Sequence, residues 1–146
     1  MGVSKASATW DGTIKQGRGA MKPDHAAEIP FSFSSRFEGQ AASNPEEVVG
    51  AALAGCFSMA LSLGLEKAGH PPKSIRTSAS VHLNRDGDGF KIDKIELTTR
   101  ASVPGLDADR FTAIAEATKK ACPVSKALAG VDSITLQASL EPESAA

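Results

Sequence analysis

The residues best suited to carry out chemistry are two cysteines, Cys56 and Cys122, in a chain of 146 residues. A thiolate is a strong nucleophile, and two thiols in one domain can also form a reversible disulfide. A small secreted domain held together by disulfides normally uses more cysteines than this. The pair therefore indicates either two inert thiols or a redox couple.

Cys56 lies in the apolar stretch GAALAGCFSMALSLGL, residues 50–65. Free cysteine is among the most buried residue types, and a thiol in apolar surroundings has a raised pKa and is inert. A reactive Cys56 would need a cation beside it, and Arg36 and Arg18 are the candidates. Periodicity alone favours packing, so both interpretations of Cys56 stay open at this point.

Cys122 precedes Pro123, at the expected junction between two helices. It is either a packing residue or a resolving thiol, which would condense with a sulfenic acid on Cys56 to form a disulfide. That reaction needs the two Cα atoms within about 7 Å of each other. The separation in sequence does not reveal this distance.

Composition and motifs exclude several other classes of protein. The net charge is −1 and the basic residues are scattered, which disfavours nucleic acid and membrane surfaces as partners. No apolar run approaches the roughly 20 residues that span a bilayer, and the N-terminus has no signal core, so we expect a cytoplasmic protein. Phosphate-loop, dinucleotide and C-x-x-C motifs are missing, and the three histidines lack metal-ligand spacing, so we expect neither cofactor nor metal.

The elements that must position the cysteines follow from periodicity and turn signals. We expect an N-terminal hairpin around Asp11-Gly12 and a strand over 29–37 with alternate aromatic residues. A long helix should begin at Asn44-Pro45 and end near Gly69, with an apolar stripe that includes Cys56.

The second half of the sequence predicts two strands, two helices and a final strand. The strands 75–83 and 90–103 flank a turn, and a change of parity near Asp93-Lys94 indicates a bulge. Helices are expected over 107–121 and 124–128, then a strand over 134–140 and a frayed tail over 141–146. The fold class is therefore α+β with mostly antiparallel pairing, in a single domain over residues 1–146.

Six segments of the chain resemble one known family in the same order. They are W-D-G-x-I-K-x-G-x-G at 10–19, RFEG at 36–39, NPEE at 44–47, AALAGCFSMALS at 51–62, VPGLD at 103–107 and ACPVSKAL at 121–128. Together they resemble the OsmC/Ohr family, the osmotically inducible protein C and organic hydroperoxide resistance proteins. The resemblance covers nearly the whole chain and is closer to the OsmC branch.

The resemblance implies a fold of antiparallel sheets wrapped around a long central helix and a second helix, in an intertwined homodimer with shared active sites. It implies a thiol-dependent peroxidase that reduces organic hydroperoxides, and less well hydrogen peroxide, to alcohols. An external dithiol, lipoyl-type or other, would serve as the reductant. The alternative is a non-catalytic module that binds small hydrophobic ligands and has inert buried thiols.

Roles for single residues also follow from the resemblance. Cys56 would be the peroxidatic cysteine and Cys122 the resolving cysteine. Arg36 would stabilise the thiolate, and Glu46 would orient Arg36. Because the Ohr branch takes its arginine from a more N-terminal segment, Arg18 remains an alternative to Arg36.

A second choice and a geometric difficulty remain at this site. Glu47 competes with Glu46 for the orienting role. Ten residues of straight helix rise about 15 Å, so Glu46 and Cys56 could not serve one site directly. We therefore expect the helix to break near Gly50 or Gly55, or Arg36 to bridge the gap, or the partner subunit to contribute. The apolar walls of a substrate pocket are expected from Phe37, Phe57 and Met59.

Overall fold

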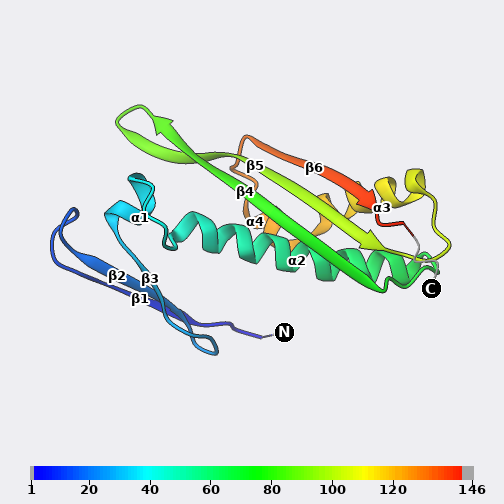
Figure 1. Ribbon diagram of the computed structural model, residues 1–146, viewed down its shortest axis with the longest axis horizontal. Helices are drawn as coiled ribbons and strands as arrows, with labels where there is room; N and C mark the ends of the chain where they lie inside the picture. The colour runs from blue at the N-terminus through cyan, green and yellow to red at the C-terminus, as the bar shows by residue number, and fades with distance from the viewer. Residues whose placement is uncertain (1, 143–146) are drawn as a thin grey trace. The chain divides into compact units, whose positions relative to one another are not determined.

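The computed structural model describes residues 2–142, which form two compact units. The N-terminal unit ends at Val48 and the C-terminal unit begins at Val49. Figure 1 shows the order of the elements along the chain. The single domain over residues 1–146 stays a prediction. Of the tail expected to fray over 141–146, residues 143–146 lie outside the described part, and the Glu141 N–H donates to the Ala101 carbonyl at 2.8 Å.

The N-terminal unit contains a three-stranded antiparallel sheet in the order β1-β2-β3, formed by β1 (Ala6–Asp11), β2 (Arg18–Pro23) and β3 (Ile29–Phe31). The predicted hairpin is confirmed, although its second strand begins at Arg18. The Gly17 N–H donates to the Thr13 carbonyl at 2.7 Å, so the residues before β2 form a turn. The rings of Trp10 and Phe31 lie 5.5 Å apart, on either side of Gly19.

The strand expected over 29–37 is wrong beyond Phe31, because Phe33–Phe37 form the short helix α1. Ser32 and Ser35 make a reciprocal capping box. The Ser35 N–H donates to Ser32 Oγ at 3.2 Å, and the Ser32 N–H donates to Ser35 Oγ at 2.9 Å. These two bonds satisfy backbone donors that a strand would leave unpaired here. Arg36 is consequently in the last turn of a helix rather than on a strand.

The long helix α2 (Pro45–Lys67) begins where the sequence predicts. Asn44 Oδ1 accepts the Glu47 N–H at 2.9 Å and caps the first turn. The helix continues through Gly50 and Gly55 without interruption, so the expected break is wrong. A Cβ atom on Gly50 would lie 3.1 Å from Val81 Cγ2, so this glycine allows β4 to approach the helix closely. Packing against the sheet thus offsets the low helix propensity of glycine.

The C-terminal unit combines a three-stranded sheet with α2 and two further helices. Its elements are β4 (Ser74–Asp86), β5 (Gly89–Ser102), α3 (Ala108–Ala121), α4 (Pro123–Ala127) and β6 (Ser133–Leu140). The β4–β5 register shifts at His82/Leu83, which leaves Asp93 as the extra residue and confirms the predicted bulge. β6 pairs parallel to β5, because α3 and α4 form a crossover connection between these two strands. The α+β class is confirmed, with a mixed sheet in place of a purely antiparallel one.

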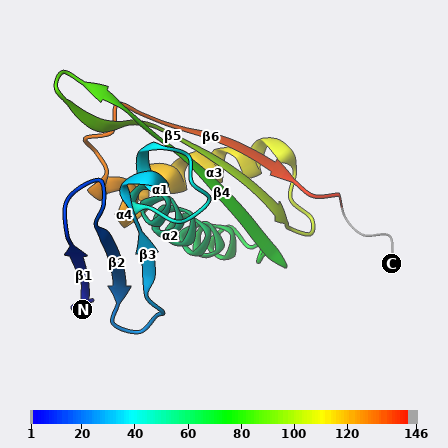
Figure 2. The same cartoon turned by 60° about the vertical axis from the view of Figure 1, so that its left-hand side comes forward.

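The core of the C-terminal unit lies between its sheet and the helices α2 and α3, which cover one face of the sheet (Figures 1 and 2). Every fourth residue of α2 is fully buried in this core: Leu53, Phe57, Leu61 and Leu65. A chain of hydroxyl groups also joins α2 to the sheet. Ser58 Oγ donates to Thr77 Oγ1 at 2.7 Å, and Thr77 Oγ1 lies 3.0 Å from Thr99 Oγ1.

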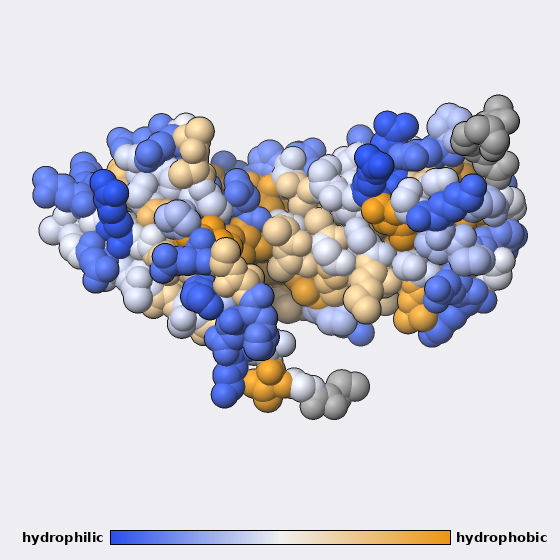
Figure 3. Space-filling model, turned by 60° about the horizontal axis from the view of Figure 1, so that its bottom comes forward, coloured by the Kyte–Doolittle hydropathy of each residue, from blue (hydrophilic) through white to orange (hydrophobic). Residues whose placement is uncertain are grey.

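The opposite side of α2 is apolar and exposed. Met59 is 81% exposed and Leu63 is 51% exposed. Tan and orange side chains gather over α2 in Figure 3. By length and composition alone α2 could cross a membrane, with a mean hydropathy of 2.0 over 18 residues, contrary to the sequence-based expectation. The same helix nevertheless supplies the core of the C-terminal unit.

Gly17 offers a test of the first hairpin. A Cβ atom there would lie 2.5 Å or less from the carbonyl oxygens of Thr13 and Asp11, so the turn would have to shift. We expect Gly17→Ala to lower the free energy of unfolding by about 2 kcal/mol in urea denaturation. Gly130→Ala is the matched control, because no atom lies within 4 Å of its added methyl group. Equal stabilities for the two variants would contradict this account of the turn.

Candidate active site

The two cysteines meet in the C-terminal unit. Cys56 is in the middle of α2, and Cys122 links α3 to α4. Their Sγ atoms lie 2.9 Å apart, and both are free thiols. Cys122 is fully buried, whereas Cys56 is partly exposed. The structure thus brings together two residues whose distance the sequence left open.

Pro123 explains why the chain turns at Cys122. Proline cannot continue α3, and its fixed φ suits the first position of α4. The Cys122 N–H still donates to the Thr118 carbonyl at 2.9 Å, so this residue terminates α3. The Cys122 side chain therefore contacts α2 at Cys56.

Burial raises the pKa of Cys56, and the hydrogen bond with Cys122 raises it further. The backbone of Val124 acts in the opposite direction but does not reverse the shift. None of the causes is a cation of the described C-terminal unit, residues 49–142. Within this unit, Cys56 is therefore a protonated thiol at neutral pH.

The pKa of Cys122 is shifted in the other direction. Burial acts to raise the pKa of Cys122, but hydrogen bonds from Cys56 and from the backbone of Ser125 and Val124 lower it more. Backbone N–H groups at the start of α4 therefore favour ionisation of Cys122 over ionisation of Cys56. Neither N–H group was predicted, although the Cys122-Pro123 pair signals a new helix start at this position.

A second pair of charged residues lies in the N-terminal unit. Arg36 Nε and Nη2 both donate to Glu46 Oε1, at 3.0 Å and 2.7 Å. Glu46 is buried and Arg36 is partly exposed. Glu46, and not the exposed Glu47, is the ion-pair partner of Arg36, while the role of this pair at Cys56 stays a prediction.

The Arg36–Glu46 pair is held in place by contacts between α1 and the start of α2. Asn44 Nδ2 donates to the Ser35 carbonyl at 3.1 Å. Asn44 therefore caps α2 and fixes α1 with the same side chain. Sequence reasoning identified Asn44 only as a cap. The Ser32-x-x-Ser35 spacing is the signal that could have predicted α1.

The unbroken helix separates the two pairs along α2. Glu46 and Cys56 are ten positions apart, which corresponds to about 15 Å of rise. The pair of thiols and the ion pair also belong to different units. The joint site of Cys56, Cys122, Arg36 and Glu46 therefore stays a prediction.

The remaining predicted residues have different surroundings. Arg18 begins β2 and, with Lys15, lines a cavity of about 330 Å³ in the N-terminal unit. Phe57 is fully buried in the core of the C-terminal unit, and its expected role as a substrate-pocket wall stays a prediction. Phe37 and Met59 are exposed. No group of three potential metal ligands occurs among residues 2–142.

The contact between the thiols predicts their oxidation chemistry. One equivalent of diamide should form an intramolecular bond between Cys56 and Cys122, detected by peptide mapping. Because this bond closes a loop of 66 residues, it should raise the free energy of unfolding by about 4 kcal/mol. Cys122→Ser is the control and should show no stabilisation. Dimers linked through disulfides, without the intramolecular bond, would contradict the geometry.

Comparison with known proteins identifies the family to which the sequence is similar. The family described as OsmC-like protein matches residues 37–137. The chain is 47% identical over 126 residues to a protein of Escherichia coli (strain K12) named Peroxiredoxin OsmC, with 85% of this chain and 88% of that protein covered. A protein of Shigella flexneri with the same name matches to the same extent.

Solved structures share the fold. An organic hydroperoxide resistance protein from Elizabethkingia anophelis superposes with a TM-score of 0.72 at 23% identity, over 97% of this chain and 99% of that one. The organic hydroperoxide resistance protein OhrB of Bacillus subtilis gives a TM-score of 0.66 at 25% identity, over 94% and 98%. The family match spans well over half of the sequence and includes both cysteines. The chain therefore belongs to the OsmC family.

Proposed function

We propose that the protein is a thiol-dependent peroxidase that reduces organic hydroperoxides to alcohols. The observation that carries the proposal is the 2.9 Å contact between Cys56 and Cys122. The curated relatives from E. coli and S. flexneri are named peroxiredoxins, which supports the same chemistry. A non-catalytic module with inert thiols is not favoured, because packing alone does not require two sulfur atoms in contact.

The reaction follows from the chemistry of the two thiols. The Cys56 thiolate attacks the terminal oxygen of the hydroperoxide, the O–O bond breaks, and the alkoxide takes a proton and leaves as the alcohol. Cys56 is then a sulfenic acid. Cys122 attacks this sulfur, an S–S bond forms, and hydroxide leaves and is protonated to water. An external dithiol restores both thiols by exchange and itself becomes a disulfide.

Activation of Cys56 needs a cation, because burial raises the pKa of this thiol. Arg36 is the candidate, and its bonds to Glu46 orient the guanidinium. The 15 Å rise from Glu46 to Cys56 along α2 favours delivery of Arg36 by the partner subunit of a homodimer. In that arrangement the guanidinium lowers the pKa of Cys56 and donates hydrogen bonds to the departing oxygen.

The exposed side of α2 supports the homodimer. Ala51, Ala52, Gly55 and Met59 lie there as small or apolar residues on one side of the helix. A contiguous apolar surface of this kind is typical of subunit interfaces. The cytoplasm is the proposed location, since free thiols in contact persist in a reducing compartment. Lipoyl-type or other small dithiols would serve there as reductants.

Replacement of each cysteine tests the division of roles. Cys56→Ser should abolish consumption of cumene hydroperoxide, because the nucleophile is lost. Cys122→Ser should complete one turnover and stop, with one sulfenic acid per chain that dimedone labels. Multiple turnovers by the Cys56 variant, with the same dithiol as reductant, would refute the proposal.

Arg36→Met tests activation of the nucleophile. Without the guanidinium the pKa of Cys56 rises, so less thiolate is present at neutral pH. The midpoint of the pH profile for alkylation of Cys56 should therefore move to higher pH. Lys22→Met, which removes another positive charge from the N-terminal unit, is the control and should leave the midpoint unchanged.

The same variants test whether the site is shared between subunits. Arg36→Met and Cys56→Ser chains, each nearly inactive alone, should regain activity when they are co-expressed. One site of each heterodimer would then combine an intact Arg36 with an intact Cys56. No recovery in verified heterodimers would show that both residues act within one chain.

A further inference from the structure

A buried hydroxyl group without a hydrogen-bond partner lies in α4. Ser125 Oγ is buried and makes no hydrogen bond with any residue between 2 and 142. No other buried side-chain nitrogen or oxygen atom in this part of the chain lacks a partner. A buried polar group that is left unpaired costs free energy, so native proteins rarely keep one. The hydroxyl therefore calls for a group that satisfies it in another state of the protein.

The group beside this hydroxyl is the thiol of Cys122, three residues earlier in the sequence. Burial raises the pKa of Cys122, but donors lower it: the Cys56 thiol, then the backbone of Ser125 and Val124, and then the Ser125 hydroxyl. Pro123 has no N–H group, so these are the first donors that follow the cysteine in the chain. One short segment thus directs a side-chain hydroxyl and backbone N–H groups at a single sulfur atom.

Helix packing fixes the position of the hydroxyl relative to this sulfur. α3 lies close to α2 at Gly64, where a Cβ atom would be 3.3 Å from Ile114 Cγ2, and α3 ends at Cys122. The Lys126 N–H donates to the Cys122 carbonyl at 3.0 Å, which closes the first turn of α4 around Ser125. The hydroxyl and the sulfur are therefore held on the same turn.

The protonation state of Cys122 decides whether the hydroxyl is satisfied. A thiol sulfur is a weak acceptor, so Ser125 Oγ has no partner while both cysteines are protonated. A thiolate carries a full negative charge, and a hydrogen bond to a charged group is about twice as strong as one between neutral groups. Loss of the Cys122 proton therefore gives the buried hydroxyl its missing acceptor.

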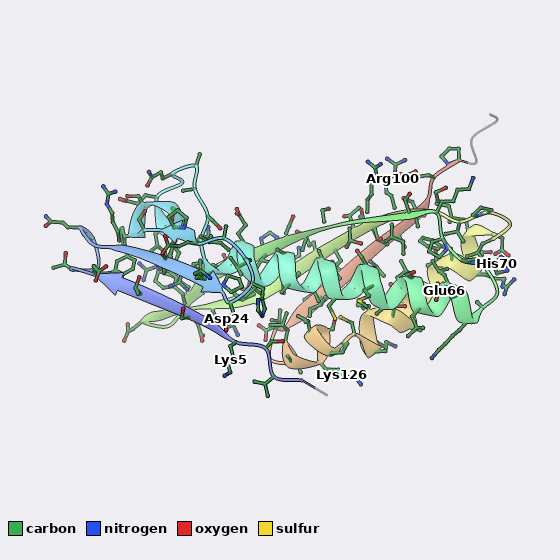
Figure 4. All side chains as sticks on the ribbon, turned by 90° about the horizontal axis from the view of Figure 1, so that it is seen from below. Lys5, Asp24, Glu66, His70, Arg100 and Lys126 are labelled. Carbon is green, nitrogen blue, oxygen red and sulfur yellow. The ribbon has the colours of Figure 1, made fainter. Side chains whose placement is uncertain are left out.

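No charged side chain in the surroundings of Cys122 takes over this task. Cys56 on α2 is the titratable group that faces it, and lysine, arginine and carboxylate groups are not among the causes of the shift in the pKa of Cys122. β6 packs against α3 and has no charged residue in Ser133–Leu140. Figure 4 labels Lys126 on α4. The lysines nearest in the sequence are exposed or ion-paired: Lys119, Lys120 and Lys126.

We propose that Ser125 is a positioning residue that stabilises the ionised form of Cys122 and thereby accelerates closure of the Cys56–Cys122 disulfide. The role in turnover rests on the proposed function. In that step the Cys122 thiolate attacks the sulfenic sulfur of Cys56, the S–S bond forms, and hydroxide leaves and is protonated to water. Ser125 donates a hydrogen bond to the attacking sulfur and keeps its own proton.

Titration of Cys122 tests the inference without any peroxide. In the Cys56→Ser background Cys122 is the only thiol, so the ultraviolet absorbance of the thiolate reports on one group. Ser125→Ala should raise the midpoint by about one pH unit, because a hydrogen bond to a charged sulfur is lost. Ser125→Thr keeps a hydroxyl group and should keep the midpoint. An unchanged midpoint in Ser125→Ala, or an equal rise in Ser125→Thr, would overturn the assignment.

Unfolding in urea at acidic pH separates this role from a structural one. Ser125→Ala removes a hydroxyl that has no partner when both thiols are protonated, so the urea midpoint should stay equal or rise. Ser58→Ala is the matched control, because it removes a hydroxyl that donates to Thr77 Oγ1 at 2.7 Å. It should lower the urea midpoint and leave the titration of Cys122 unchanged. A loss in Ser125→Ala as large as that in Ser58→Ala would contradict the inference.

Single-turnover kinetics connect Ser125 to the peroxidase reaction. With one equivalent of cumene hydroperoxide, Ser125→Ala should form the Cys56 sulfenic acid at the normal rate. Closure of the disulfide should then slow about threefold at neutral pH, because the smaller thiolate fraction is partly offset by a more nucleophilic sulfur. Excess hydroperoxide should consequently convert more Cys56 to sulfinic acid. Equal slowing of both steps would count against a role confined to Cys122.

The titration and the turnover assay fail independently. If the unmodified protein does not consume cumene hydroperoxide, the proposed function is refuted, whereas a raised midpoint in Ser125→Ala still supports the effect of Ser125 on Cys122. If cumene hydroperoxide is consumed normally and the midpoint does not move, the role of Ser125 alone is refuted.

Discussion

The close packing of α2 against α3 is the constraint on which the rest of the site depends. Gly64 permits the approach, and Pro123 ends α3 at the height of Cys56. The buried residues at every fourth position of α2 fix the rotation of the helix about its axis. Because the rotation of α2 and the position of Cys122 along it are both fixed, the two sulfur atoms are held in contact. The redox pair is therefore a consequence of helix packing rather than of a dedicated loop.

The same packing creates an electrostatic conflict. Burial brings the thiols together but disfavours a negative charge on Cys56, while the backbone of α4 favours it on Cys122. A peroxidase needs the two thiols to ionise in the reverse order, with the nucleophile Cys56 losing its proton before Cys122. In the proposed mechanism Arg36, which is paired with Glu46 in the N-terminal unit, would supply the cation that this order requires. A homodimer in which Arg36 of one chain lies beside Cys56 of the other chain would lower the pKa of Cys56 and favour ionisation of the nucleophile.

Much of this fold could be predicted from local signals, because caps, turns and parity act over a few residues. Asn44-Pro45 gave the start of α2, and the change of parity gave the bulge at Asp93. Alternate aromatic residues indicated a strand where the Ser32–Ser35 capping box makes a helix. The parallel pairing of β6 and the continuity of α2 depend on tertiary packing, which a single sequence does not show. For the site, family resemblance supplied the candidate residues, and only coordinates supplied the sulfur–sulfur contact and the pairing of Arg36 with Glu46.

The continuity of α2 has one consequence for the geometry of the site. A helix without a hinge has a fixed length, since hydrogen bonds at every turn resist compression. Glu46 and Cys56 therefore keep one spacing along α2, and a second chain that supplies a cation to Cys56 would have to match that spacing.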